Sequence, residues 1–266
     1  LGILGGGQLG RMSAMAAARL GIKTHIFCPE TDAPASQVAA QTFVADYTDK
    51  AALRKFAQSV DVISYEFENI PTSALDLLES IAPVRPARRA LAVSQDRIIE
   101  KTFLRDLGLA IAPWAEVTDA ASMTAAMQTV GAPGVLKTTR NGYDGKGQYR
   151  LRLAADIEAA WTALGRAPLI LEASVSFDRE LSVIAVRGQD GEFRAYPLTQ
   201  NWHTDGVLSL SLAPAPNSDD VAAVAVECAQ LLADRLVYVG VFALELFEKD
   251  GELLANEMAP RVHNSG

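Results

Sequence analysis

Short apolar segments alternate with amphipathic segments over the first ninety residues, and this alternation limits the possible folds more than any other feature. Four apolar runs are predicted to be buried strands: residues 1–4, 22–27, 42–44 and 62–65. Helices are predicted between the first two strands, through residues 11–12 and ending at residue 20, and over residues 49–58 and 72–79. Strands and helices at this spacing form a parallel sheet covered on both faces, which predicts an α/β domain. We place its end at residue 86, because Pro83 and Pro86 break the pattern.

The pattern changes after residue 86. Helices are predicted over residues 87–93, 96–107, 119–130, 156–164 and 219–236. Strands are predicted around 135–138, 148–153, 169–171, 180–187, 193–196, 207–212, 239–247 and 253–258. The Asp190-Gly191 and Asp250-Gly251 pairs favour hairpin turns, because Asp-Gly accepts positive φ. Residues 87–266 are therefore predicted to form an α+β domain centred on antiparallel sheet.

The composition bounds the function classes. The 24 Lys and Arg against 32 Asp and Glu give a net charge of −8, which argues against nucleic acid or an anionic membrane as the main partner. Hydrophobic residues make up 49%, enough for a large core, yet no apolar run reaches the length of a membrane span. The two cysteines form no disulfide framework or metal cluster, so a reducing cytoplasm is expected.

A glycine-rich turn follows the first predicted strand. Gly5-Gly6-Gly7-Gln8-Leu9-Gly10 fits G-x-G-x-x-G, whose backbone N–H groups can bind an anion at a helix N-terminus. With Glu30 as the ribose ligand, it would form a dinucleotide site. The same turn also serves mononucleotides or tight packing. Glu66 and Glu68 follow the strand at 62–65, where ligands of α/β sheets bind, although a solvated strand end is equally consistent.

The segment 136–148 carries more chemical information. Lys137 ends an apolar strand and is followed by Gly142, Gly145, Lys146 and Gly147. Such a backbone can fold over a polyphosphate and donate N–H bonds while the two lysines neutralise charge. The alternative is a hairpin with scattered charges. We predict a lid over a nucleotide, within a subdomain of about residues 112–172.

Four carboxylates lie at the ends or in the middle of predicted strands. Glu172 is suited to an adenine amino group or a ribose hydroxyl, and Glu180 opens a later strand, although each could be solvated. Glu245 interrupts an apolar strand, and the Asp250-Gly251 hairpin brings it beside Glu257. With the carbonyl of Asn256, this pair predicts a Mg²⁺ site shared with nucleotide phosphates.

The last residues and one isolated histidine complete the candidates. Arg261, His263 and Asn264 follow the predicted metal site and suit an anionic co-substrate. His203 is predicted to lie in a loop, where a lone histidine usually makes a structural hydrogen bond.

These motifs, in this order, resemble the ATP-grasp superfamily. The segments 6–12, 65–70, 95–97, 141–148 and 256–266 resemble, within it, the 5-(carboxyamino)imidazole ribonucleotide synthetases of purine biosynthesis. The resemblance covers the whole chain. It implies a Rossmann-like N-terminal domain over residues 1–86 and an ATP-grasp domain over 87–266, with a lid and an antiparallel-sheet subdomain. The family continues past Asn-Ser-Gly into a small C-terminal domain, which we expect to be missing from this chain.

The resemblance also implies roles for individual residues. Phosphates would be bound by Arg97, Lys137 and Lys146, under a lid made of Gly142, Tyr143, Asp144, Gly145, Lys146, Gly147 and Gln148. Adenine would be read by Glu172, Ala173, Ser174 and Val175, ribose by Glu180, and the nucleotide pocket would be lined by His203 and Asn256. Glu245 and Glu257 would hold Mg²⁺. The ribonucleotide or bicarbonate would be contacted by Gln8, Glu68, Tyr143, Asp144, Arg261 and His263.

The implied reaction consumes ATP and bicarbonate. Bicarbonate oxygen attacks the γ-phosphate to give carboxyphosphate, whose carboxyl group is captured by the exocyclic amine of aminoimidazole ribonucleotide. Asp144, Lys146 and Arg261 are the candidate catalytic residues, with Asp144 as the proton acceptor. A homodimer is expected. The alternatives are a nicotinamide-dependent oxidoreductase, a formate-dependent glycinamide ribonucleotide transformylase, a biotin carboxylase-like enzyme and a nucleotide-binding module without catalysis.

Overall fold

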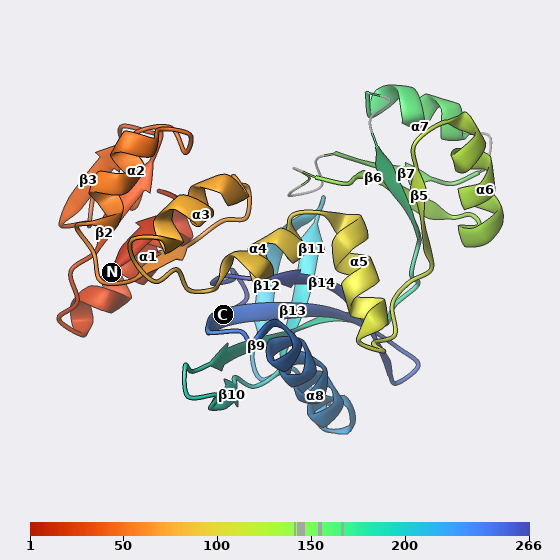
Figure 1. Ribbon diagram of the computed structural model, residues 1–266. Coiled ribbons are helices and arrows are strands. Elements are labelled where there is room, and N and C mark those ends of the chain that lie inside the picture. Colours follow the sequence, from red (N-terminus) through yellow and green to blue (C-terminus); the bar gives the residue numbers. More distant parts are fainter. Residues whose placement is uncertain (141, 143–146, 154–155, 166–167) are drawn as a thin grey trace.

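The computed structural model describes residues 1–140, 142, 147–153, 156–165 and 168–266. Figure 1 shows a central sheet with an N-terminal α/β part on one side and a smaller sheet on the other. Helices α4 (Arg88–Ser94) and α5 (Arg97–Asp106) run between these two outer parts. None of the helices formed by the described residues is long and apolar enough to cross a membrane.

The N-terminal part contains a four-stranded sheet in which all neighbouring strands are parallel, in the order β3-β2-β1-β4. Its strands are β1 (Gly2–Leu4), β2 (His25–Cys28), β3 (Gln41–Val44) and β4 (Ile63–Tyr65). Its helices are α1 (Gln8–Arg19), α2 (Lys50–Ala57) and α3 (Thr72–Glu79). Asp49 caps α2 by accepting from two backbone N–H groups. The predicted parallel-sheet domain is confirmed.

The central sheet is antiparallel, in the order β12-β11-β9-β13-β14, and β10 pairs with β9. Its strands are β9 (Arg179–Arg187), β10 (Phe193–Ala195), β11 (Thr199–Thr204), β12 (Val207–Leu212), β13 (Gly240–Lys249) and β14 (Glu252–Ala259). Helix α8 (Asp219–Leu236) packs small buried residues such as Ala225 and Ala229 against Val183 and Leu244 of this sheet. This packing leaves the opposite face of the sheet available for a site.

The smaller sheet is also antiparallel, in the order β5-β8-β6-β7. Its elements are β5 (Trp114–Val117), α6 (Ala120–Val130), β6 (Gly134–Thr138), β7 (Gln148–Leu151), α7 (Ile157–Ala163) and β8 (Leu169–Ala173). Leu136 and Leu171 are fully buried and share a core with Met123 and Trp161. Its elements fall almost entirely within the residues 112–172 predicted for the lid subdomain.

One predicted loop is a strand in the structure. Residues 201–206 were expected to form a loop, but β11 extends to Thr204 and pairs with both β9 and β12. The register of β11 and β12 shifts between Trp202 and His203, which marks a β-bulge. Because polar side chains occupy this strand, the alternation of apolar and polar residues that predicts a strand is weak there.

The glycine-rich turn between β1 and α1 already holds a carboxylate of the protein. Glu66 Oε1 accepts the Gly7 N–H at 2.5 Å, and Oε2 accepts the Gly10 N–H at 2.9 Å. A Cβ at Gly7 would lie 2.7 Å from Glu66 Oε1, so this approach needs glycine. The helix dipole favours an anion here, and Glu66 fills the position that a dinucleotide phosphate would need. Because Glu66 occupies this position, the nicotinamide alternative loses its support.

We expect Glu66→Ala to lower the free energy of unfolding by about 2–3 kcal/mol, because it leaves two N–H groups without their charged acceptor. Urea unfolding followed by circular dichroism measures this difference. The matched control is Glu30→Ala, which removes an exposed carboxylate and should change the free energy by less than about 0.5 kcal/mol. If the two variants are equally stable, the hydrogen bonds from the Gly7 and Gly10 N–H groups to Glu66 do not stabilise the fold.

Candidate active site

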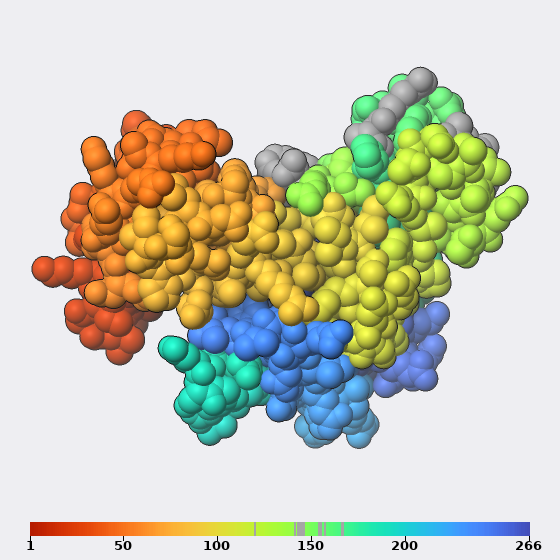
Figure 2. Space-filling model, viewed as in Figure 1, coloured from red at the N-terminus to blue at the C-terminus, as the bar shows by residue number. Residues whose placement is uncertain are grey.

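A cleft of about 980 Å³ lies where the N-terminal part, the central sheet and the smaller sheet meet. In Figure 2 the surface is hollowed between the orange N-terminal part and the green smaller sheet. Every described residue to which the family resemblance gave a role lines this cleft. These residues are Gln8, Glu68, Arg97, Lys137, Gly142, Gly147, Gln148, Glu172, Ala173, Ser174, Val175, Glu180, His203, Glu245, Asn256, Glu257, Arg261 and His263. The predicted site residues Tyr143, Asp144, Gly145 and Lys146 lie outside the described residues.

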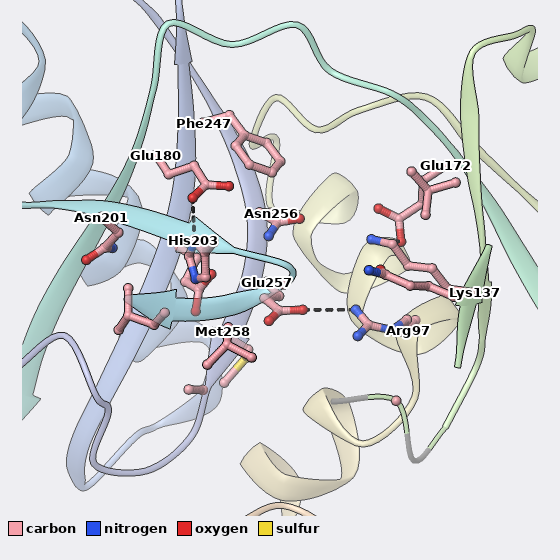
Figure 3. A pocket seen from close by; sticks show the side chains of 18 of the residues that line it. Arg97, Lys137, Glu172, Glu180, Asn201, His203, Phe247, Asn256, Glu257 and Met258 are labelled. Atoms are coloured by element: carbon pink, nitrogen blue, oxygen red, sulfur yellow. Dashed lines mark hydrogen bonds and ion pairs between the residues drawn. The ribbon is translucent and has the colours of Figure 1, made fainter. Parts of the chain in front are cut away.

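A β-bulge in β14 sets the geometry of the acidic side of the cleft. Glu245 of β13 pairs directly with Glu257 of β14, and the next pair is Leu246 with Ala255. Asn256 is therefore the extra residue of the bulge. In a regular strand, neighbouring side chains point to opposite faces, but here Asn256 and Glu257 both line the cleft. Asn256 and Glu257 are both labelled among the pocket-lining side chains in Figure 3.

Each of the two paired carboxylates contacts a basic side chain from elsewhere in the chain. Arg97, on α5, donates from Nη1 to Glu257 Oε2 at 2.9 Å. Burial opposes ionisation of Glu257, but Arg97 and nearby lysines outweigh it and lower its pKa to about 2. His263 Nε2 lies 2.9 Å from Glu245 Oε1. Because His263 Nδ1 accepts the Ser265 N–H, Nε2 carries the proton and donates to Glu245.

The acidic side fits a magnesium ion that is completed by a ligand. Among the described residues, no three His, Cys, Asp or Glu side chains are grouped to hold a metal by themselves. Mg²⁺ is commonly bound through one or two carboxylates together with substrate phosphates, and the Glu245–Glu257 pair has that composition. The donor set is therefore compatible with a metal carried by a nucleotide.

The lid side of the cleft is built around Glu172, at the end of β8. Lys137 Nζ, from β6, lies 3.1 Å from Glu172 Oε1, and Lys101 Nζ lies 3.2 Å from Oε2. Burial raises the pKa of Glu172, but the two lysines outweigh it and the net shift is downward. Glu172 is only 4% exposed, and Ala173, Ser174 and Val175 line the cleft beside it.

Opposite the lid strands, the cleft wall is formed by β9, β11 and β13. His203 Nδ1 makes a short hydrogen bond to Glu180 Oε2, and the hydrogen bond raises the pKa of His203 (Figure 3). Phe247 lies along the same wall and stacks on Phe177, with ring centroids 4.7 Å apart. An apolar ring beside a carboxylate is a combination that could accommodate a nucleoside.

The N-terminal part closes the other end of the cleft. Gln8 Nε2 donates to Asn264 Oδ1 at 3.1 Å, which joins α1 to the last residues of the chain. Arg261 Nε lies 3.0 Å from Glu68 Oε1. Burial raises the pKa of Glu68, and Arg261 opposes that shift. This end therefore presents an arginine and two amides to an anionic ligand.

Sequence reasoning missed several residues that support the site. Glu100 and Lys101 on α5 are almost fully buried, and Glu100 accepts the Met258 N–H at 2.7 Å. Ser182 Oγ lies 2.8 Å from Ser265 Oγ and accepts from Asn201, so a polar chain reaches His263. The sequence offered one signal: Glu100 and Lys101 share a helix face with Arg97 and Leu104, at spacings of three and four residues.

Two known domain families match this chain, one over its N-terminal part and one over the rest. Residues 1–95 match the ribonucleotide synthetase preATP-grasp domain, and residues 102–266 match the ATP-grasp domain. A cleft between two antiparallel sheets, with lysine on one side and paired carboxylates on the other, agrees with these matches. The fold and the site thus define an enzyme of the ATP-grasp class.

Individual relatives narrow this class. The N5-carboxyaminoimidazole ribonucleotide synthase of Brucella melitensis is 51% identical over 269 residues, which cover all of this chain and 74% of that protein. The crystal structure of the synthetase from Thermus thermophilus has a TM-score of 0.95 at 45% identity, over all of this chain and 72% of that one. An Aspergillus clavatus synthase in complex with ADP and 5-aminoimidazole ribonucleotide has a TM-score of 0.90 at 32% identity, over 100% and 70%. The chain belongs to the N5-carboxyaminoimidazole ribonucleotide synthase family.

The histidine signals in a nuclear magnetic resonance titration will test the His203–Glu180 contact. We expect the pKa of His203 to lie above 6.5 and that of His25 below it, because burial lowers the latter. Since the folded state binds the His203 proton more tightly, its contribution to stability is complete below pH 6.5. That contribution is lost as the pH rises through the pKa of the folded state. Glu180→Gln should return the His203 pKa toward 6.5 and leave His25 unchanged; an unshifted His203 signal would contradict the contact.

Proposed function

We propose that this protein uses ATP and bicarbonate to carboxylate the exocyclic amine of 5-aminoimidazole ribonucleotide. The products are N5-carboxyaminoimidazole ribonucleotide, ADP and phosphate. The observation that carries the proposal is a single cleft with two sets of groups. Arg97, Lys137 and the paired carboxylates line one part of it, Arg261 and the amides of Gln8 and Asn264 line the other, and His263 contacts Glu245 between them. Relatives named for this synthesis support the proposal.

The nucleotide end provides charge on both sides of a polyphosphate. Arg97 and Lys137 approach from α5 and β6, and each is now paired with a carboxylate that a phosphate can replace. Glu180 and His203 are placed to receive ribose hydroxyl groups, and residues 173–175 are placed to read the base edge. The phosphates would therefore lie between Arg97, Lys137 and the lid residues 142–148.

Glu245 and Glu257 would hold Mg²⁺, with Asn256 beside them. The ion would supply charge stabilisation for the transferring phosphoryl group. Asn256 and Glu257 can both serve because the bulge turns both toward the cleft. Arg97 holds the carboxylate of Glu257 ionised, with its pKa at about 2, which is the protonation state that metal binding requires.

The opposite end suits bicarbonate and the ribonucleotide. Arg261 can stabilise the negative charge of bicarbonate and of carboxyphosphate, and Glu68 fixes its guanidinium. His263 has its Nε2 proton committed to Glu245, so it orients that carboxylate and lines the cleft. Gln8 reaches the same end from α1. Asp144 and Lys146 stay candidates for the proton acceptor and a phosphate ligand; both lie outside the described residues.

Several wider features belong to the same proposal. We place the division between the two domains at residues 86 and 87, with the lid at about 112–172. We also propose bicarbonate as the carboxyl donor, a homodimer as the assembly and the cytoplasm as the compartment. The domain division rests on the break at Pro83 and Pro86 and the compartment on the two isolated cysteines, whereas the bicarbonate and the homodimer rest on the family resemblance of the motifs.

Phosphate release from ATP tests the reaction itself. With bicarbonate present, we expect 5-aminoimidazole ribonucleotide to raise the release of phosphate, and bicarbonate-free buffer to remove this increase. Replacing the two substrates by formate and glycinamide ribonucleotide tests the transformylase alternative. Stimulation by that second pair alone, or no stimulation by either, would overturn the proposed function.

We expect Glu257→Gln to lower kcat/KM by about 10²–10³-fold, because a neutral amide holds Mg²⁺ poorly and loses transition-state charge stabilisation. Initial rates at several Mg²⁺ concentrations measure this effect, and higher Mg²⁺ should recover part of the loss. Glu252→Gln is the matched control, because Glu252 lies on the same strand and is exposed. Equal rates in both variants would contradict the role of Glu257.

A further inference from the structure

Lys101 is a buried lysine that lines no part of the cleft, yet it contacts two of its walls. Its side chain is 1% exposed and comes from α5. Nζ lies 3.2 Å from Glu172 Oε2 and donates to the Asn256 carbonyl oxygen at 2.8 Å. A buried ammonium group is costly unless it is paired and hydrogen-bonded, and these two acceptors supply that compensation.

The two acceptors belong to different sheets. Glu172 ends β8 in the smaller sheet, and Asn256 is the bulge residue of β14 in the central sheet. The labelled positions in Figure 3 lie on the two sides of the pocket. One ammonium group therefore joins the lid side to the central sheet at the base of the cleft. Lys137 reaches Glu172 from within the smaller sheet and makes no such connection.

We propose that Lys101 is a positioning residue for the nucleotide, acting as a bridge between the two sheets that enclose it. The inference rests on the nucleotide half of the proposed function. Lys101 gives Glu172 a permanent counter-charge, so that Lys137 can leave this carboxylate and bind phosphate without stranding a buried anion. It also fixes the carbonyl of the bulge that turns Asn256 and Glu257 into the cleft.

The neighbouring Glu100 supports the same backbone segment. Its carboxylate accepts the Met258 N–H at 2.7 Å, two residues beyond the carbonyl that Lys101 holds. Strand β14 is the edge of its sheet, so on its outer side these side chains take the place of a neighbouring strand. Adjacent residues on one helix thus fasten the backbone on both sides of Glu257.

Removing the charge of Lys101 should weaken nucleotide binding in two ways. Glu172 would keep Lys137 as its only counter-charge among the described contacts, so phosphates would have to compete for that lysine. The Asn256 carbonyl would lose its donor, and the bulge would be less well fixed. Both effects act on the nucleotide, whereas Arg261 and Glu68 lie at the other end of the cleft.

Calorimetric titration of ADP with Mg²⁺ into the protein tests the bridge. We expect Lys101→Met to raise the Kd for ADP by about 10-fold or more at a temperature well below its Tm. In turnover, the KM for ATP should rise while the KM for 5-aminoimidazole ribonucleotide changes less than about 2-fold. Lys55→Met is the matched control, because Lys55 is an exposed lysine on α2, and it should leave the Kd for ADP unchanged.

A double variant separates this role from general support of the fold. If Lys101 acts through Glu172, the losses in ADP affinity from Lys101→Gln and Glu172→Gln will be less than additive when combined. Lys101→Gln also replaces Lys101→Met if the latter does not fold. A lower Tm with an unchanged Kd for ADP, or fully additive losses, would overturn the inference. Absence of ADP binding by the unaltered protein would instead overturn the proposed function.

Discussion

Ion pairs around one cleft connect the parts of this structure. Arg97 joins α5 to Glu257 of the central sheet, Lys101 joins the same helix to both sheets, and Arg261 joins the end of the chain to Glu68 in the N-terminal part. Each pair connects elements far apart in the sequence. The Lys101–Glu172 pair is buried, so moving either of its elements would leave an unpaired buried charge, which is strongly unfavourable; the other two pairs are partly exposed. The same pairs that line the site therefore also fix how its walls are placed.

In the glycine-rich turn, a carboxylate of the protein takes the position of an anionic ligand. The sequence G-x-G-x-x-G places backbone N–H groups at a helix N-terminus, and that arrangement attracts any anion. Here Glu66 supplies the anion from the end of the neighbouring strand. Glu66 thereby fixes the N-terminus of α1, whose first residue, Gln8, donates to Asn264. The turn thus contributes a positioned amide to the cleft, and its own anion position is filled by protein.

Most of the candidate site could be predicted from the sequence, because a charged residue that ends an apolar run marks the end of a strand. Lys137 and Glu172 each close an apolar run, and the Asp250-Gly251 hairpin places Glu245 beside Glu257, as the register confirms. Three features could not be predicted from the sequence. The bulge at Asn256 depends on tertiary packing, β11 carries polar residues toward the cleft, and Lys101 meets a partner 155 positions away. Charged residues in a helix usually face solvent, and although Lys101 shares a helix face with Arg97 and Leu104, this spacing does not show that Lys101 is buried.

The pairing pattern also bears on which form of the ligand the cleft can accept. Arg97, Lys137, Arg261 and His203 are each already matched with a carboxylate. A bare polyphosphate would take the cations and leave Glu257 without its counter-charge. A polyphosphate that carries a divalent cation brings both signs, so the phosphates can replace the carboxylates while the cation compensates Glu245 and Glu257. The exchange then conserves charge on each side of the cleft, which favours nucleotide and metal arriving together over either one alone.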